Sequence, residues 1–361
     1  MEKKLYWYSR FGRIEVLEQQ YIQFGQAHQV IRPFQSSAQV HCRCYSMPLQ
    51  RVITDFGADV PFGQIPKKLL EHHGVSVPIS SAQGITQSHA QRILDTQSLA
   101  SEVGTGTGAA TLIAQMDGSM IPIVDTTPSE TDAQTIDRRK TRKLGWKEAR
   151  LAVAQDPKKP LPIFGATLGS VDEAGAQLLD SAIRAGLGTE TFVHGVGDGA
   201  PWIALQMDAR LGEPGRFLLD FYHLCDYLAE ASQVCAPNAP KAWMEQQKRR
   251  LKLNHFKAVL KALKPYREAD SVPDPQAPVR VAYRYLKNRP HHLDYKGAIE
   301  AGLPIGSGEI ESAHRYIIQN RLKRAGAWWT VENAQAMLAL RVLRENQDWD
   351  DYWLNLAPAT A

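Results

Sequence analysis

The chain has 361 residues, of which 43% are hydrophobic and 22% are charged, the composition of an ordinary globular protein with room for two or three domains. No apolar stretch approaches the length needed to span a bilayer, and the first residues lack the apolar core of a secretion signal. Four cysteines give no disulfide framework, so a cytoplasmic protein is expected. A net charge of +4 is too mild to establish a polyanionic partner.

The N-terminal region, residues 1–105, is expected to be packed and to carry a helical DNA-binding segment. His41-Cys42-Arg-Cys44 is too short and too isolated for a zinc site, so both cysteines are interpreted as structural.

Residues 63–96 predict two helices around a turn. Apolar residues recur at helical spacing up to His73, Gly74 can end the first helix, and Ser80 or Ser81 can cap the second. The second helix presents polar residues of the kind that read base edges, including Gln87 and Arg92, so a helix-turn-helix is one interpretation. A plain helical hairpin is the other.

Strand patterns begin near residue 111. Gly104-Thr-Gly-Thr-Gly108 lacks the lysine of a phosphate loop and is interpreted as a flexible linker. Strands are then expected in five segments, with a helix over 172–186; the strand segments are 112–117 with 120–124, 146–154, 162–168, 192–196 and 216–221. This order predicts an α/β fold with a mixed sheet flanked by helices. Pro122 should mark a bulge or incomplete pairing.

The rest of the chain reads as helical. Helices are expected over 222–264, 281–287, 311–326 and 331–345, with a Pro- and Asp-rich loop at 265–280.

Three acidic residues occupy positions suited to a common site. Asp117 and Asp198 each end an apolar run, and Glu311 stands at a predicted helix start. Two strand-end aspartates and a helix-borne glutamate form an oxygen cage suited to Mg²⁺ or Mn²⁺, which can hold two ions across a phosphodiester. Asp-Gly after a strand is also ordinary turn chemistry. Glu309 competes for the third position, but residues two apart on a helix point roughly 200° apart, and a Ser307 cap would give Glu309 a role in the first turn.

Five segments of the chain resemble bacterial insertion-sequence transposases of the acidic-triad (DDE) type, the Kra-like group, with a looser relation to Mutator-like transposases. The segments are Met116-Asp-Gly-Ser-Met-Ile-Pro-Ile, Trp146-Lys-Glu-Ala-Arg, Gly197-Asp-Gly-Ala-Pro-Trp-Ile203, Leu219-Asp-Phe-Tyr-His223 and Leu303-Pro-Ile-Gly-Ser-Gly-Glu-Ile-Glu311. The resemblance runs from about residue 50 to 355.

This resemblance implies a ribonuclease-H-like catalytic domain in two parts, residues 106–237 and 303–361, separated by a helical insertion over 238–302. It implies metal-dependent cleavage at transposon ends and strand transfer into target DNA, with Asp117, Asp198 and Glu311 as metal ligands. His223, in Asp220-x-x-His223, matches a Mutator-like signature; a capping Asp beside a half-buried His is the alternative.

The same resemblance implies DNA as partner, both terminal inverted repeats and target, a homo-oligomer in the synaptic complex, no nucleotide cofactor and association with the nucleoid. Basic stretches at 137–143, 248–264 and 315–324 could bind phosphates, although each could instead be a solvated surface. Trp328 and Trp329 could stack on unpaired bases or pack internally. The basic and aromatic candidates are Arg138, Arg139, Lys140, Arg142, Arg321, Lys323, Arg324 and Trp328.

Overall fold

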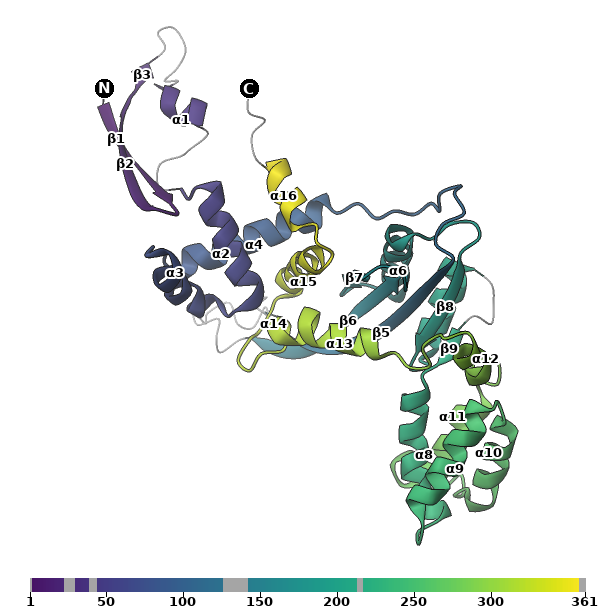
Figure 1. The fold of residues 1–361 in the computed structure, drawn as a ribbon. Helices are drawn as coiled ribbons and strands as arrows, with labels where there is room; N and C mark the ends of the chain where they lie inside the picture. Colours follow the sequence, from purple (N-terminus) through teal and green to yellow (C-terminus); the bar gives the residue numbers. More distant parts are fainter. Residues whose placement is uncertain (1, 23–29, 39–43, 126–141, 213–216, 357–361) are drawn as a thin grey trace, which may run out of the picture. The chain divides into compact units, whose positions relative to one another are not determined.

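The computed structural model describes residues 2–22, 30–38, 44–125, 142–212 and 217–356. It separates into two compact units whose elements are drawn in Figure 1. The first unit comprises Met1–Gln97, Pro122–Gly145 and Gln319–Ala361, and the second comprises Ser98–Ile121 and Trp146–Ile318.

The first unit is largely helical. A hairpin of β1 and β2 opens it, with a two-residue pair, β3 and β4, beyond it. The bounds of the strands and helices are β1 Glu2–Ser9, β2 Gly12–Gln19, β3 Tyr21–Ile22, β4 Val30–Ile31, α1 Pro33–Ala38, α2 Met47–Asp59, α3 Ile65–His73, α4 Ile79–Thr96, α14 Asn320–Leu322, α15 Val331–Glu345 and α16 Trp349–Leu356.

Helices α2, α3 and α4 pack around a small apolar core. Leu49, Ile53, Ile65 and Leu69 are fully buried there. The α2–α4 approach depends on Gly57, since a Cβ at that position would lie 2.2 Å from the Thr86 Oγ1 atom.

The two helices expected within residues 63–96 are confirmed, with one difference at the start of the second. Helix α3 ends at Gly74, whose φ of 64° suits glycine. Helix α4 begins at Ile79 after Pro78, with no side-chain cap, so the expected capping by Ser80 or Ser81 is wrong.

A five-stranded mixed sheet organises the second unit, and helices flank it, as the strand patterns predict. Its strands are β5 Thr111–Asp125, β6 Lys143–Gln155, β7 Ile163–Thr167, β8 Phe192–Gly197 and β9 Phe217–Leu219, in the order β7-β6-β5-β8-β9. The β5–β8 and β8–β9 pairs are parallel, whereas β6 and β7 are antiparallel. Pro122 lies in β5 beyond the residues that pair with β8.

Two helices cover the sheet. Helix α6 (Val171–Ala185) starts with a capping box between Ser170 and Glu173, and α7 (Pro201–Leu211) starts with a proline in its first turn. Both contribute to a core that includes Met116, Leu178, Ile203 and Phe217.

The glycine-rich segment before β5 is held in place rather than acting as a flexible linker, so that expectation is wrong. The Gly106 oxygen accepts a hydrogen bond from the Thr189 amide at 3.0 Å, and the Thr107 oxygen accepts one from Glu190 at 3.2 Å. Gly108, at φ +77°, lies so close to Gly188 that a Cβ would approach the Gly188 nitrogen to 2.4 Å.

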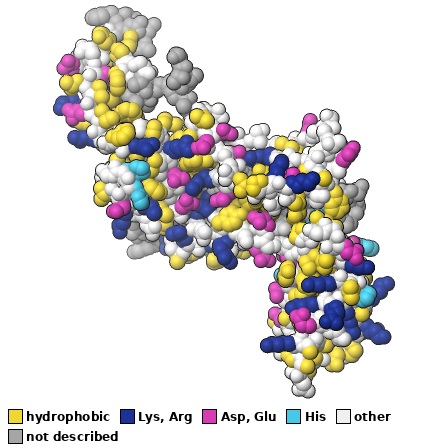
Figure 2. Space-filling view, in the orientation of Figure 1, with side chains coloured by type: hydrophobic (Ala, Val, Ile, Leu, Met, Phe, Trp, Pro, Cys, Tyr) yellow, Lys and Arg dark blue, Asp and Glu magenta, His cyan; other side chains and the backbone are white. Residues whose placement is uncertain are grey.

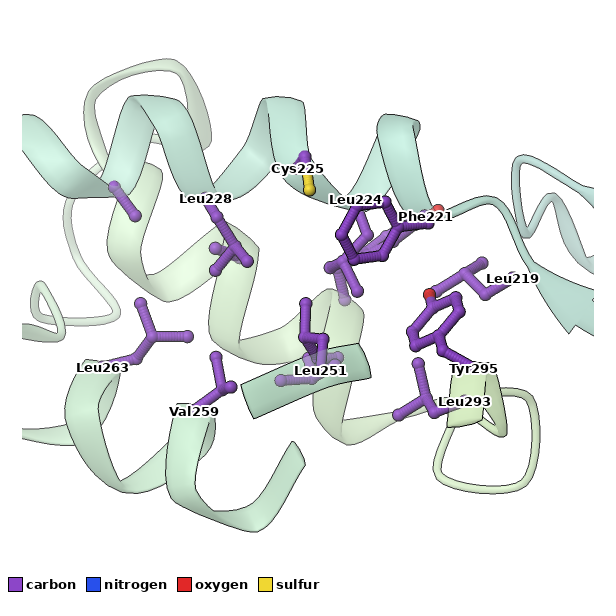
Figure 3. Packing of buried hydrophobic residues seen from close by; sticks show 14 of the residues in the cluster. Leu219, Phe221, Leu224, Cys225, Leu228, Leu251, Val259, Leu263, Leu293 and Tyr295 are labelled. Carbon is purple, nitrogen blue, oxygen red and sulfur yellow. The ribbon is translucent and has the colours of Figure 1, made fainter. Parts of the chain in front are cut away.

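Five helices follow β9 and enclose a second core, seen in Figure 3. They are α8 Phe221–Cys235, α9 Pro240–Lys252, α10 Phe256–Leu263, α11 Pro278–Lys287 and α12 Tyr295–Glu300. The long helical stretch expected over 222–264 is therefore three helices, since Pro240 starts a new one. Fully buried side chains meet at their centre, namely Leu224, Leu228, Leu251, Val259, Leu263 and Tyr295.

Helix α13 (Gly308–Ala313) continues into a π-helical turn over His314–Gln319, so the helix expected over 311–326 starts three residues earlier and changes pitch. Among the helices that the structure describes, none is both long enough and apolar enough to cross a membrane.

Candidate acidic site at the sheet edge

Asp117 and Asp198 fall at the same level of two neighbouring parallel strands. Every residue pair between β5 and β8, from Thr111↔Phe192 to Gln115↔Val196, is offset by 81 positions, which is also the separation of Asp117 and Asp198. Neighbouring strands lie about 4.8 Å apart, and residues two apart on a strand share a face. Asp117 lies within β5, so the expectation that it ends a strand is wrong, whereas Asp198 directly follows β8. Continued past Gln115↔Val196, the same register sets the two aspartates at one level of the sheet.

The turn that carries Asp198 is fixed by α11. The Tyr285 hydroxyl donates to the Asp198 backbone oxygen, and the Arg289 guanidinium donates to the Gly199 oxygen at 2.8 and 3.0 Å. Gly199 has a φ of +79°, and a Cβ there would lie 2.3 Å from Leu219. The Asp198 Oδ1 atom accepts from the Ala200 amide at 2.9 Å, which orients its carboxylate at the start of α7.

Residues 303–310, which precede Glu311, are hydrogen-bonded to the sheet and to the first residue of α8. The His194 Nε2 atom lies 2.8 Å from the Pro304 oxygen, the Phe221 amide donates to Ile305 at 2.8 Å, and the Ile310 amide donates to Gln115 Oε1 at 3.0 Å. Gln115 lies two residues before Asp117 on β5, so α13 starts over the face that both side chains share.

Asp220 joins this segment to α8 and is 1% exposed. Its Oδ1 atom accepts from the Tyr222 and His223 amides at 2.6 and 2.9 Å, and its Oδ2 atom accepts from the Ser307 amide at 2.6 Å and from the Ser307 hydroxyl. Asp220 is therefore a buried helix cap. This agrees with the interpretation of Asp220-x-x-His223 as a capping Asp beside a half-buried His.

Gly306 completes the fit, because a Cβ there would lie 2.5 Å from the Tyr222 ring. The Pro-Ile-Gly-Ser-Gly run thus has a local physical reason, which is close docking of backbone against the end of β9 and the start of α8.

Glu309 and Glu311 have different surroundings. The Tyr316 hydroxyl lies 3.4 Å from Glu309 Oε1, and the Tyr316 ring meets Phe164 of β7 edge-on. Glu311 instead has Asp220, Asp117 and His223 as charged neighbours.

The pKa of the Glu311 carboxyl is raised, first by burial and then by the negative charges of Asp220 and Asp117, while His223 opposes the rise. A cation placed among these acids would relieve their repulsion. This electrostatic link to Asp117 makes Glu311, rather than Glu309, the better candidate for the third ligand.

His223 is half-buried at the start of α8. Its ring meets Tyr227 and Tyr285 edge-on, with centroids 5.3 and 6.0 Å away. Trp202 is half-buried, packs against the sheet core and lies under the Arg150 guanidinium at 5.6 Å. His194, buried and bonded to Pro304, has a pKa lowered by burial and serves to hold the segment.

Carboxylate oxygens are hard donors of the kind that Mg²⁺ and Mn²⁺ prefer. Within the described ranges, no three His, Cys, Asp or Glu side chains are already gathered closely enough to hold one ion. Mg²⁺ commonly uses one or two carboxylates and completes its shell with water and substrate phosphates, so a closed protein cage is not required. Asp117, Asp198 and Glu311 are the residues that would hold such ions.

The basic candidates divide into three groups. Arg138, Arg139 and Lys140, with Cys42, lie outside the described residues, whereas Arg142 and Lys323 are exposed and Arg324 is half-buried. Arg321 is 2% exposed, with its guanidinium 4.7 Å from the Phe62 and Trp329 rings and its Nε atom donating to the Gly57 oxygen. Arg321 therefore packs within the first unit and presents no surface to a phosphate.

The two adjacent tryptophans also differ, since Trp329 is 4% exposed and Trp328 is 39% exposed. Only Trp328 has the exposure that stacking on a base needs.

On α4, Arg92 is exposed and Gln87 half-buried, but Thr86 and His89 are buried among α2, α15 and α16. His89 lies 2.7 Å from the Tyr352 hydroxyl and 2.9 Å from Gln50, and Trp353 lies beside its ring. Burial of Thr86 and His89 therefore removes them from the polar face of α4 expected to read bases, while Gln87 and Arg92 remain on it.

Sequence reasoning missed several residues that shape the site. Gln115 interrupts an apolar run two positions before Asp117, and His314 follows Glu311 by three positions, so strand and helix periodicity could have indicated both. Tyr285 and Arg289 lie nearly ninety positions from the turn they hold, and only the fold brings them there.

A family model described as "Uncharacterised protein family (UPF0236)" matches residues 188–351, fewer than half of the chain. The chain is similar to that family over the stretch that holds Asp198, His223 and Glu311, while Asp117 lies before it. None of the curated proteins compared matches the chain.

Proposed function

We propose that this protein is a DDE transposase, which cleaves DNA at transposon ends and joins them to target DNA with Mg²⁺ or Mn²⁺. The observation that carries the proposal is the register between the neighbouring strands β5 and β8. The β5–β8 register puts Asp117 and Asp198 at one level, and Gln115 ties the start of the Glu311 helix to the same face.

The order of elements supports a ribonuclease-H-like domain, the fold that the sequence resemblance implies. In chain order β5 is the first strand of the sheet and carries Asp117, β8 is the fourth and is followed by Asp198, and α13 comes after five helices that follow the fifth strand, β9. Three acids on these elements are the arrangement that such a transposase needs.

Two bound ions would activate the attacking oxygen and stabilise the leaving oxygen of a phosphodiester. The chain's own part is to fix the ligands. The Ala200 amide orients Asp198, and the Gly118 amide donates to Asp117 Oδ1 at 2.7 Å. Asp220 and Gln115 set the position of α13, and His223 lies where it can offset negative charge near Glu311.

DNA as substrate is supported by the charge of the helices beyond β9. Residues 221–300 hold 14 Lys and Arg against 8 Asp and Glu, a net +6 that exceeds the +4 of the whole chain. Figure 2 shows Lys and Arg side chains over this helical part. Such a surface is attracted to phosphates in a salt-dependent manner. Joining two ends would need more than one copy of the chain, so we include a homo-oligomer in the proposal.

The test is cleavage and joining of labelled element ends by purified protein with Mg²⁺. Asp117→Asn, Asp198→Asn and Glu311→Gln should each reduce cleavage by more than the roughly 10- to 100-fold that follows loss of an outer partner of a metal ligand. DNA binding should remain. Glu309→Gln is the matched control and should keep most of the activity.

Each result has a distinct meaning. Cleavage without joining would indicate a ribonuclease-H-like nuclease, and DNA binding with no metal-dependent cleavage would indicate a regulator derived from a transposase. Full activity in any of the three acid variants would remove that residue from the site.

A further inference from the structure

His314 is a buried polar side chain whose hydrogen bonding is incomplete. It is 3% exposed, and among the residues that the structure describes neither ring nitrogen has a partner with hydrogen-bond geometry. Its Nε2 atom nevertheless lies 3.1 Å from Asp117 Oδ2, so the distance of a hydrogen bond is present while the angle is not. A buried polar group without a partner costs about 1–3 kcal/mol and calls for an explanation.

The position of His314 relates it to the acidic site. It follows Glu311 by three residues, so the two side chains share one face of the helix. It is also the first residue of the π-helical turn His314–Gln319. Single π turns within α-helices are frequently found at functional sites.

Within the part of the chain that the structure describes, one hydrogen bond from its own strand holds Asp117. The Gly118 amide holds Oδ1 at 2.7 Å, while Oδ2 faces His314, and the Asp117 side chain is 33% exposed. A carboxylate held at one oxygen can still turn about its terminal bond. A donor at the second oxygen would fix its plane and leave one lone pair on each oxygen for a cation.

We propose that His314 is a positioning residue that donates from Nε2 to Asp117 Oδ2 and sets the orientation of this carboxylate for ion binding. The inference rests on the proposed function, since it assigns a partner to one proposed ligand. His314 acts through Asp117 and touches neither ion nor DNA. Partners of this kind commonly change metal affinity by about 10- to 100-fold.

Mn²⁺ binding to the DNA-free full chain provides a readout independent of activity. Titration calorimetry, with the spin resonance of free Mn²⁺ as a second measurement, would compare wild type, Asp117→Asn, His314→Leu and His314→Gln. We expect His314→Leu to weaken Mn²⁺ binding by about 10-fold or more. His314→Gln, whose amide reaches about as far as Nε2, should restore most of the affinity.

In cleavage assays, the substitution should change the Mn²⁺ concentration that is needed and not the maximal rate. The Mn²⁺ concentration for half-maximal rate should rise in His314→Leu, while the rate at saturating Mn²⁺ stays near wild type. Should His314→Leu fail to fold, the pair His314→Gln and His314→Asn serves instead, because the shorter Asn amide falls short of Oδ2 and should bind Mn²⁺ more weakly than Gln.

Failure of the inference can be told from failure of the proposed function. Wild type that binds Mn²⁺ through Asp117, together with unchanged binding in folded His314→Leu or equal binding in the Gln and Asn variants, overturns the role of His314 alone. Wild type without Asp117-dependent Mn²⁺ binding overturns both.

Discussion

His89 shows how a single buried side chain makes the first unit sensitive to acid. Burial, and to a lesser degree the charge of Arg92, lowers the pKa of its imidazole to about 4. Both ring nitrogens lie within hydrogen-bond distance of neighbouring groups, so the folded chain holds this histidine neutral.

The pH dependence follows from this pKa. Well above pH 6.5, the ordinary pKa of histidine, His89 is neutral in both states and its full contribution is present. As pH falls from there towards 4, the unfolded chain takes up a proton that the folded chain refuses, so stability falls. At about 1.4 kcal/mol per pKa unit, roughly 2 kcal/mol should be lost by pH 5.

Urea unfolding at pH 7.5 and pH 5 tests this prediction. The loss on acidification should be larger in wild type than in His89→Gln, which keeps polar contacts but cannot titrate. An equal loss in the two proteins would show that His89 is not responsible.

The sequence pattern predicts which residues have a suitable chemical group better than it predicts whether those residues are buried or exposed. The sequence singles out Asp117, Asp198 and Glu311 because each interrupts or ends a periodic run, and their grouping around one metal site stays a proposal. Arg321 has the same basic character as Lys323, and only the packing of Phe62 and Trp329 around it distinguishes a buried arginine from a surface one.

At the scale of elements, Asp220 is the joint between the sheet, α8 and the segment that leads to α13. Its four hydrogen bonds use both carboxylate oxygens, and two of them reach residue 307, 87 positions away.

Asp220→Ala should therefore lower the free energy of unfolding by about 2–4 kcal/mol. Losing a helix cap costs roughly 0.5–2 kcal/mol, and the buried Ser307 groups left without an acceptor add about 1–3 kcal/mol. Asp226→Ala, a change on the exposed face of the same helix, should stay within about 0.5 kcal/mol. Denaturant unfolding of both variants measures the two changes in the free energy of unfolding. Equal changes would show that Asp220 does not hold these elements together.

Element types were predictable where periodicity is strong, as for α3, α6 and the strands of the sheet. The sequence predicts helix throughout 222–264 without marking the breaks, because the apolar residues continue through the turns at Pro240 and His255. The start of α13 and its change of pitch could not be predicted for a different reason. Its first turn and its change of pitch depend on contacts with β5 and Asp220, which no local pattern encodes.

At the scale of the molecule, charge is distributed unevenly. The +6 of residues 221–300 is offset elsewhere, so a whole-chain charge of +4 understates the attraction that the helical part would exert on the proposed DNA partner.

Lys257 and Lys261 are exposed and one turn apart on α10, which suits them to phosphate contacts. If each contacts a phosphate, the double variant Lys257→Ala, Lys261→Ala should weaken DNA binding about equally for all sequences. It should also reduce the slope of log affinity against log salt by about 2. Fluorescence anisotropy at several salt concentrations measures both.

Lys158→Ala, an exposed change in the turn after β6, is the control for charge alone and should leave the slope unchanged. A slope in the double variant equal to that of wild type would exclude these lysines from the DNA surface.

The hydrogen bonds that hold residues 303–310 beside the start of α8 affect where this domain can accept insertions. The chain leaves the sheet at Asp220 and returns at Ser307. The Ser307 amide donates a hydrogen bond to Asp220, so the helical segment between them begins and ends at the same place. Lengthening such a segment costs little, about 0.6 kcal/mol for each doubling of a flexible loop. The turn between α8 and α9 can therefore accept additional residues as long as α11 keeps its place, because Tyr285 and Arg289 of α11 hold the turn that carries Asp198.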